Sequence, residues 1–228
     1  MERYEIAGLQ VDMAVSGRTK RQAAAYAVPA SGAAELILQC DPAAVLRQYP
    51  ELGDPEDAEY VGTGSLFAKR LLDFGGFQLH ASAVVTDGRA YLFSAPSGMG
   101  KSTHAEKWVR LFGASYLNDD KPALRRQGDI WMAYGTPWSG KHDLSSPTGA
   151  PLGGIAFLWR GQENRITAME AAQALPLLMS QTVYRLPREQ MERLLTMADH
   201  ILRNVPIWRL ECRNDDEAAR VSYAAMTG

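Results

Sequence analysis

The stretch LHASAVVTDGRAYLFSAPSGMGKST, residues 79–103, decides the fold class of this 228-residue chain. Its first part predicts two strands, residues 79–86 and 89–94, joined by Asp87-Gly88, a dipeptide favoured in type I′ hairpin turns. Its second part predicts a loop of small residues that leads into a helix from Lys101 to about Phe112. A strand that passes through such a loop into a helix indicates an α/β fold.

The loop carries the strongest chemical signal in the chain. It matches the phosphate-binding pattern G-x-x-x-x-G-K-[ST], also called Walker A, except that Ala95 replaces the first glycine. Small residues let backbone N–H groups turn toward phosphate oxygens, and the N-terminus of the following helix favours an anion. Lys101 would add positive charge near the β- and γ-phosphates, and Ser102 would place a hydroxyl on Mg²⁺. We therefore expect ATP and Mg²⁺ to bind at Ala95, Pro96, Ser97, Gly98, Met99, Gly100, Lys101, Ser102 and Thr103.

Two carboxylates and a histidine are expected beside this loop. The helix should make a β-α-β crossover into a strand at residues 114–117 that lies beside the starting strand, which brings Asp119 and Asp120 next to the loop. One carboxylate can hold Mg²⁺ while the other accepts a proton from a hydroxyl nucleophile. Asp119 is our candidate base and Asp120 our candidate metal ligand, with the reverse assignment open. His80 begins the strand that the hairpin pairs with the strand leading into the loop. We therefore expect His80 to point to the same end of the sheet and to have a functional role there.

A loop rich in Gly, Ser and Pro, residues 135–151, is a further candidate because long irregular loops often carry function. Trp138 is expected to be exposed there and to contact substrate, and Lys141 to contact a phosphate or carboxylate. In the alternative interpretation Trp138 packs beneath its own loop and Lys141 is solvated. His104 and His142 are interpreted as orienting or surface residues.

The chain is expected to divide into a small β-rich N-terminal accessory unit, residues 1–63, and an ATP-binding catalytic domain, residues 64–228. Short strands are predicted at 4–15, 26–29 and 35–40, a helix begins at Asp41-Pro42, and the acidic stretch 49–59 is predicted to be a loop. A helix at 65–74 should end at Gly75. The second half adds strands at 123–126, 130–134, 154–160, 165–169 and 207–210, and helices at 171–181, 188–203 and from 215.

Composition limits the classes of partner. The chain has 24 basic and 26 acidic residues, a net charge of −2, which speaks against a nucleic-acid binder that works through a basic surface. No apolar run approaches the roughly 20 residues that span a bilayer, and the N-terminus lacks the apolar core of a signal peptide. Cys40 and Cys212 form no metal pattern. We expect a cytoplasmic protein with no membrane partner.

Two groups of residues resemble a known family. Residues 97–102 followed by Asn118-Asp119-Asp120 resemble the core of HPr kinase/phosphorylase, and residues 79–83 are similar to the His-x-Ser-Ala segment of ATP-dependent phosphoenolpyruvate carboxykinase. The resemblance begins near Gly64 and implies the mixed β-sheet with a phosphate loop that these families share. It is nearest to HPr-kinase-like proteins associated with modified (lasso) peptide biosynthesis. It implies catalytic roles for Lys101 and His80, while the carboxykinase arginine motif and the substrate-gripping C-terminal loop of HPr kinase have no counterpart.

The main hypothesis is a Mg²⁺-dependent ATP phosphotransferase, a kinase that phosphorylates a hydroxyl, with a serine of a peptide or small protein as acceptor. The catalytic residues would be Asp119, His80, Lys101 and Lys141, and the metal ligands Ser102 and Asp120. A kinase for a small metabolite such as free serine is the first alternative. An ATP-binding regulatory module is the second. Assembly into a homo-oligomer is left open.

Overall fold

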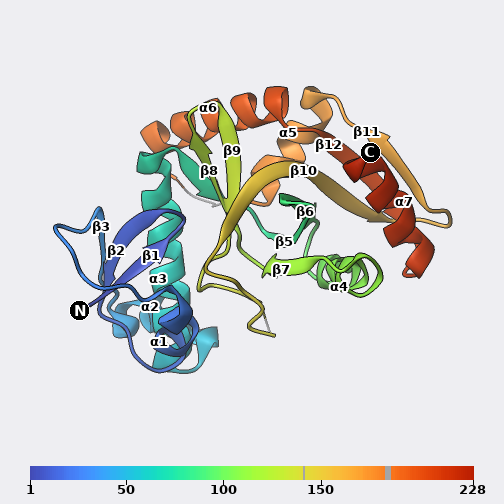
Figure 1. Cartoon of the computed structure of the whole chain (residues 1–228). Coiled ribbons are helices and arrows are strands. Elements are labelled where there is room, and N and C mark those ends of the chain that lie inside the picture. Colours follow the sequence, from blue (N-terminus) through green and yellow to red (C-terminus); the bar gives the residue numbers. More distant parts are fainter. Residues whose placement is uncertain (141, 183–185) are drawn as a thin grey trace.

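The computed structural model describes residues 1–140, 142–182 and 186–228. These residues form a three-stranded sheet near the N-terminus and a nine-stranded mixed sheet that curls through the rest of the chain (Figure 1). Helix α3 (Pro55–Leu71) contacts strands of both sheets. This architecture confirms the predicted α/β class, with a mixed sheet and a small β-containing N-terminal part.

The N-terminal sheet consists of a hairpin and one further strand. Strand β1 (Glu2–Ile6) pairs antiparallel with β2 (Leu9–Met13), and β3 (Leu36–Leu38) lies parallel to β2. The strand predicted at 26–29 is wrong, since only an isolated bridge between Tyr4 and Ala27 forms there. Alternating side chains of β2 are buried, so one face of this sheet packs into a core with α3.

Two helices in this part follow local capping signals. Helix α2 (Pro42–Gln48) begins where the sequence predicts, with the Asp41 carboxylate accepting a hydrogen bond from the Ala43 N–H at 3.0 Å. Helix α1 (Gly17–Ala23) was not predicted; Ser16 precedes it without a side-chain capping bond. Both helices are short and depend on packing against their neighbours.

The acidic stretch 49–59 is partly helical rather than a loop. A 3-10 turn, η2 (Pro50–Leu52), precedes α3, and α3 then begins with Asp54 capping the Asp57 N–H at 2.9 Å. Acidic residues in the first turn of α3 favour the positive end of the helix dipole, which is why this stretch is helical. The boundary expected after residue 63 falls inside α3, so the division into two units stays a prediction.

The hairpin that decides the fold forms as predicted. Strand β5 (Ala81–Thr86) pairs antiparallel with β6 (Arg89–Ser94), and the turn residues Asp87 and Gly88 both have positive φ, 49° and 73°. Helix α4 (Lys101–Phe112) follows the loop and ends at Gly113, which has φ 67°. The turn and the cap are specified by adjacent residues, which explains why both bounds were predictable.

The crossover after α4 differs from the prediction. Strand β7 (Ser115–Asn118) pairs with β5 and not with β6. Strand β6 already has β5 on one edge and the parallel strand β10 (Gly149–Arg160) on the other, so no edge is left for β7. Since β5 is antiparallel to both β6 and β7, the ends of β6 and β7 still lie at the same edge of the sheet.

Helices cover both faces of the strands around β6. Tyr91 and Phe93 pack on one face with α4 and with α7 (Asp216–Thr227), while Leu92 packs on the other face with α5 (Ala171–Ser180) and α6 (Arg188–Asn204). This alternation is the two-residue period of a strand buried on both sides. The remaining strands are β4 (Gly76–Gln78), β8 (Ala123–Gln127), β9 (Ile130–Tyr134), β11 (Arg165–Ala168) and β12 (Ile207–Cys212).

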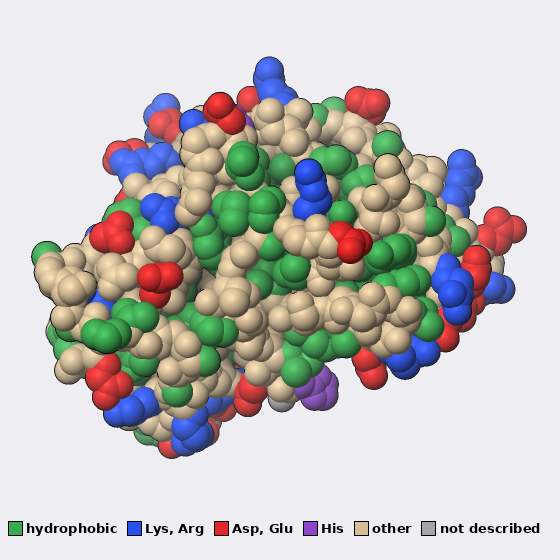
Figure 2. All heavy atoms as spheres, viewed as in Figure 1, with side chains coloured by type: hydrophobic (Ala, Val, Ile, Leu, Met, Phe, Trp, Pro, Cys, Tyr) green, Lys and Arg blue, Asp and Glu red, His purple; other side chains and the backbone are tan. Residues whose placement is uncertain are grey.

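On the face seen in Figure 2, acidic and basic side chains are interspersed around the periphery and apolar side chains fill much of the middle. Within the described ranges, none of the helices has the length and apolar character needed to cross a membrane. Cys40 and Cys212 are both free thiols and half-buried.

Candidate active site

At the edge of the sheet where β6 and β7 end, the structure brings together His80, the pair Asp119-Asp120 and the loop that begins at Ala95. Ala81, the first residue of β5, pairs with Ser94, the last residue of β6, so His80 lies beside the start of the loop at Ala95. The Ser94 hydroxyl donates a hydrogen bond to the His80 carbonyl at 2.9 Å. The Ala81 N–H donates to the Asp120 carbonyl at 3.0 Å, which brings the acidic pair to the same place.

The loop between β6 and α4 changes direction at two glycines. Gly98 and Gly100 have φ of 77° and 101°, conformations that L side chains rarely adopt. Gly100 is the N-cap of α4 and has no side chain to bond the first-turn N–H groups, which remain available to an anion at the positive end of the helix dipole.

Lys101 lies in the first turn of α4 and is 7% exposed. Its ammonium donates a hydrogen bond to the Ala95 carbonyl at 3.0 Å, so the side chain folds back over the loop. Burial lowers the pKa of Lys101, while the charges of Asp120 and Asp119 act in the opposite direction. A buried cation close to two carboxylates and to a loop of open amides can hold a polyanion.

Arg160 is a second cation at this loop and one that the sequence did not reveal. It is the last residue of β10, the parallel neighbour of β6, and its guanidinium donates to the Gly98 carbonyl at 3.1 Å. The pairing of β10 with β6 is a non-local contact, so no local pattern marks Arg160.

Asp119 is enclosed. It is 4% exposed, and its Oδ1 accepts a hydrogen bond from the buried Ser82 hydroxyl at 2.8 Å. Gly140 passes so close that a Cβ at that position would lie 3.4 Å from Asp119 Oδ2. The carboxylate is therefore held in one orientation by Ser82 of β5 on one side and covered by Gly140 on the other.

Asp120 is the more accessible member of the pair. Its side chain is 30% exposed, and its Oδ1 lies 3.3 Å from His80 Nε2. Burial alone would raise the pKa of Asp120, but the hydrogen bond from His80 and the charges of Lys121, His80 and Lys101 hold it below the ordinary value. The carboxylate stays ionised in a site where it could receive a proton during a reaction.

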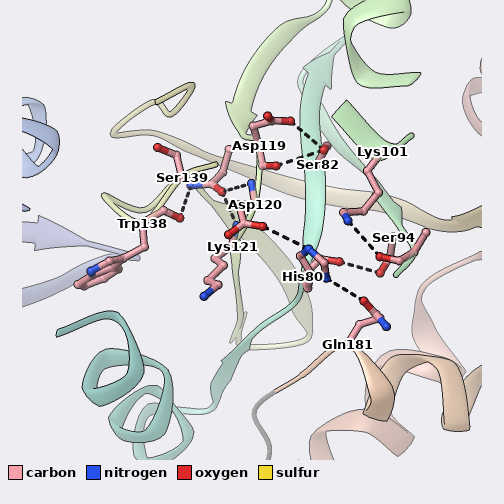
Figure 3. A network of polar contacts seen from close by, with 12 residues as sticks. His80, Ser82, Ser94, Lys101, Asp119, Asp120, Lys121, Trp138, Ser139 and Gln181 are labelled. Atoms are coloured by element: carbon pink, nitrogen blue, oxygen red, sulfur yellow. Dashed lines mark hydrogen bonds and ion pairs between the residues drawn. The ribbon is translucent and has the colours of Figure 1, made fainter. Parts of the chain in front are cut away.

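His80 is fixed from both sides. Its Nδ1 lies 2.9 Å from Gln181 Oε1 at the end of α5, opposite the Nε2 contact with Asp120 (Figure 3). The backbone N–H of His80 donates a hydrogen bond to the Gln181 carbonyl at 2.8 Å. Both ring nitrogens thus face side-chain oxygen atoms, one of Gln181 and one of Asp120. Gln181 carries no signal in the sequence that would have identified it.

Asn118 fixes the backbone of the acidic pair. Its side-chain oxygen accepts hydrogen bonds from the Asp120 N–H at 2.9 Å and the Lys121 N–H at 2.6 Å. Its amide nitrogen donates to the Thr136 carbonyl at 2.9 Å. Asn118 therefore shapes the turn after β7 and ties it to the segment that covers Asp119.

The expectation that Trp138 is exposed is wrong. Its side chain is 2% exposed, its ring stacks on Phe67 of α3 at a centroid distance of 4.9 Å, and its indole N–H donates to Thr63 at 3.2 Å. Figure 3 shows the ring directed away from the acidic pair. Trp138 belongs to the core shared with the N-terminal sheet. Lys141, the other candidate in this segment, lies outside the described residues.

The remaining histidines near the site differ in environment. His104 is buried in α4, its Nε2 lies 2.9 Å from the Ser222 hydroxyl of α7, and burial lowers its pKa to about 3. His142 is exposed. Neither contacts the acidic pair through any hydrogen bond found in the described part of the chain, in agreement with the interpretation of both as orienting or surface residues.

The donor atoms at this edge of the sheet fit Mg²⁺, which is held partly by substrate phosphates, better than they fit a metal whose ligands all come from the protein. Among the described residues, no three His, Cys, Asp or Glu side chains gather closely enough to hold a metal. Mg²⁺ commonly takes one or two carboxylates and completes its shell with water and substrate phosphates. Asp119, Asp120 and the half-buried Ser102 offer the hard oxygen atoms that such a site needs.

A cavity of about 890 Å³ opens on the other side of the His80–Asp120 pair. Its walls come from α2, α3, the residues after β3, and the turn after Asp120. His80 and Asp120 line it, whereas residues 95–103 do not. The pair therefore borders the cavity, and the loop does not.

No known family model and no curated protein sequence matches this chain. A solved structure described as the Hpr(Ser) kinase/phosphatase from Coxiella burnetii is similar to it, with 12% sequence identity and a TM-score of 0.38. The matched region covers 66% of this chain and 99% of that one. At this identity and TM-score, a functional assignment depends on the site residues themselves.

Proposed function

We propose that this protein is a Mg²⁺-dependent kinase that transfers the γ-phosphoryl group of ATP to a hydroxyl, with a serine of a peptide or small protein as acceptor. The observation that carries the proposal is the buried Lys101 at the start of α4, folded over a glycine-bearing loop, with Asp119, Asp120 and His80 at the same sheet edge. Phosphoryl transfer needs this combination of fixed positive charge and a nearby proton acceptor.

The loop and α4 would bind the triphosphate. The N–H groups in the first turn of α4 and the positive end of the helix dipole would bind an anion placed over the loop. Lys101 would exchange its hydrogen bond to the Ala95 carbonyl for phosphate oxygens, and Arg160 would do the same with its bond to Gly98. Two cations released from neutral carbonyls to phosphate make stronger, charge-assisted bonds.

Ser102 and Asp119 are the residues that we assign to Mg²⁺. Ser102 lies in the first turn of α4, and Asp119 is a carboxylate held rigid by Ser82. The ion, when bound, would neutralise phosphate charge and align the γ-phosphoryl group. Asp119 would then act by holding and orienting the Mg²⁺ ion. This role suits a side chain that an acceptor can hardly reach.

Asp120 and His80 are assigned to the acceptor hydroxyl. The sequence favoured Asp119 as the base, but Asp120 is the carboxylate that borders the cavity. In the proposed reaction the hydroxyl oxygen bonds to the γ-phosphorus, the bond between that phosphorus and the bridging oxygen of ADP breaks, and the hydroxyl proton passes to the Asp120 carboxylate. His80 holds this carboxylate in place through the contact of its Nε2 with Asp120 Oδ1.

The test is transfer of radiolabelled phosphate from ATP to a panel of serine peptides and small hydroxyl compounds, free serine included. We expect a labelled acceptor with the wild-type protein and Mg²⁺, and none with Lys101→Ala. Lys107→Ala is the matched control, because Lys107 lies on the exposed side of the same helix and bonds Asn214. ADP formation without any labelled acceptor would favour the regulatory ATP-binding module instead, and equal transfer by Lys101→Ala would refute the assignment of the loop.

A further inference from the structure

The cavity beside His80 and Asp120 has both apolar and charged residues in its lining. Val45 of α2 and Val61 and Leu66 of α3 are apolar members, and Lys69 and Lys121 are cationic ones. Its volume of about 890 Å³ lies within the range of roughly 300–1,000 Å³ typical of small-molecule sites. The cavity shares His80 and Asp120 with the candidate active site, so a molecule bound there can place one end at the reacting group.

The two lysines of this cavity are not held in ion pairs by its two carboxylates. Asp41 caps α2 and lies 3.7 Å from the Arg47 guanidinium, and Asp120 is paired with His80. Lys69 and Lys121, by contrast, form no salt bridge within the described ranges of the chain. Lys121 interacts with Asp120 only at longer range, through its charge. Each of the two carboxylates thus has a closer partner than either lysine, and the ammonium groups of Lys69 and Lys121 can contact a ligand.

The two lysines lie away from the nucleotide loop. Figure 3 shows Lys121 and Lys101 on opposite sides of Asp120. Lys69 is exposed on α3, a helix that makes no part of the loop. A triphosphate bound at Lys101 would leave Lys69 and Lys121 without an anion, so these two cations fit a second ligand.

We propose that this cavity binds the phosphoryl acceptor, and that the acceptor joins an apolar body to an anionic group that Lys69 and Lys121 bind. Its apolar body would lie against Val45, Val61 and Leu66, and its hydroxyl would reach Asp120. An acidic peptide segment and a small hydroxy acid share this chemistry. The acceptor role rests on the proposed kinase function, whereas the binding of an apolar anion can be measured without any turnover.

The binding test uses two fluorescent probes of matched shape. 8-Anilino-1-naphthalenesulfonate has an apolar ring system with one sulfonate, and N-phenyl-1-naphthylamine has the same rings without it. We expect the variant Lys69→Ala/Lys121→Ala to bind the sulfonate roughly fivefold more weakly, from the loss of two partly exposed charge contacts, and the uncharged probe as before. Lys69→Arg/Lys121→Arg should keep the affinity, and Lys107→Ala is the distant control.

A second variant locates the probe. Ala44 is an exposed residue of α2 that lines the cavity, so Ala44→Trp should fill the space and reduce binding of both probes without disturbing the core. ATP should leave the sulfonate probe bound. The proposal is overturned if the double lysine variant binds the sulfonate as well as the wild type, if Ala44→Trp has no effect, or if one equivalent of ATP displaces the probe.

The turnover test separates the two sources of acceptor. Serine peptides with an adjacent leucine and aspartate are compared with the asparagine versions, and small apolar hydroxy acids are compared with their amides. The lysine variant should raise KM for the anionic members only. If no compound is phosphorylated while the wild type still binds the sulfonate through the lysines, the kinase proposal and the acceptor role fail and the anion site stands. If neutral and anionic acceptors react alike, the acceptor chemistry proposed for the cavity is wrong.

Discussion

Replacing Asp120 by asparagine is the sharpest test of how the two carboxylates divide the work. Asp120→Asn keeps the size and shape of the side chain but removes its negative charge and its capacity to take a proton. If Asp120 accepts the acceptor proton, kcat should fall by about 10²–10⁴-fold, the usual contribution of a general base. The KM for ATP should change little, because Lys101, Arg160 and the loop amides remain.

The effect on folding should be small by comparison. The His80–Asp120 contact of 3.3 Å corresponds to about 1 kcal/mol in a water-like dielectric, and both side chains are about 30% exposed, so screening reduces it further. The free energy of unfolding should therefore fall by less than about 1 kcal/mol. A large loss of turnover with near-normal stability separates a role in chemistry from a structural one.

Asp119→Asn provides the matched comparison. Its side-chain oxygen can still accept the hydrogen bond from Ser82, so the local structure should persist. We expect a higher Mg²⁺ concentration for half-maximal rate, with kcat recovering at saturating Mg²⁺. The assay is steady-state transfer to a serine acceptor over a Mg²⁺ titration. Normal turnover by Asp120→Asn, together with a loss in Asp119→Asn that Mg²⁺ does not restore, would refute the assignment and return the base to Asp119.

Three further variants test other contacts. The folded pKa of His104, about 3, lies below its unfolded value near 6.5, so the unfolded chain takes up a proton first and the free energy of unfolding falls as the pH drops from 6.5 toward 3. Between pH 7.5 and pH 5.0, urea titration should show that this free energy falls by about 2 kcal/mol more in the wild type than in His104→Gln. Equal losses in the two proteins would contradict this prediction. Trp138→Ala should lower the free energy of unfolding by about 3–5 kcal/mol, measured by urea titration, because the ring is buried against Phe67. An unchanged free energy of unfolding together with a raised acceptor KM would instead indicate that Trp138 contacts the substrate. Arg160→Ala should raise the Kd for a fluorescent ATP analogue by roughly fivefold, whereas the control Arg165→Ala should leave it unchanged. If Arg160→Ala binds the analogue as tightly as the wild type, the role proposed for Arg160 is wrong.

Features fixed by neighbouring residues were predictable from sequence. The Asp87-Gly88 turn specifies its own positive φ values, and Gly113 ends α4 where the pattern places it. The capping of α2 by Asp41 follows the same local logic. In each case the residues that decide the conformation lie within a few positions of one another, so one sequence carries the whole signal.

Features fixed by distant contacts were not predictable. Trp138 lies in a segment with the composition of an exposed loop, yet Phe67 and Thr63 of α3 cover it. Arg160 reaches the loop only because β10 pairs with β6. Neither partner is near in sequence, and a single sequence contains no measure of which strand or helix will pack against such a residue.

The displaced position of β7 has a consequence for the chemistry. Had β7 paired directly with β6, the acidic pair would adjoin the loop with nothing between them. Because β5 lies between β6 and β7 and runs antiparallel to both, its N-terminal end adds His80 to the same edge. The inserted strand also supplies Ser82, which orients Asp119. One antiparallel strand thus separates the two carboxylates into an enclosed one beside Ser82 and an accessible one beside His80. In the proposed reaction, this division would let nucleotide and acceptor approach from different sides.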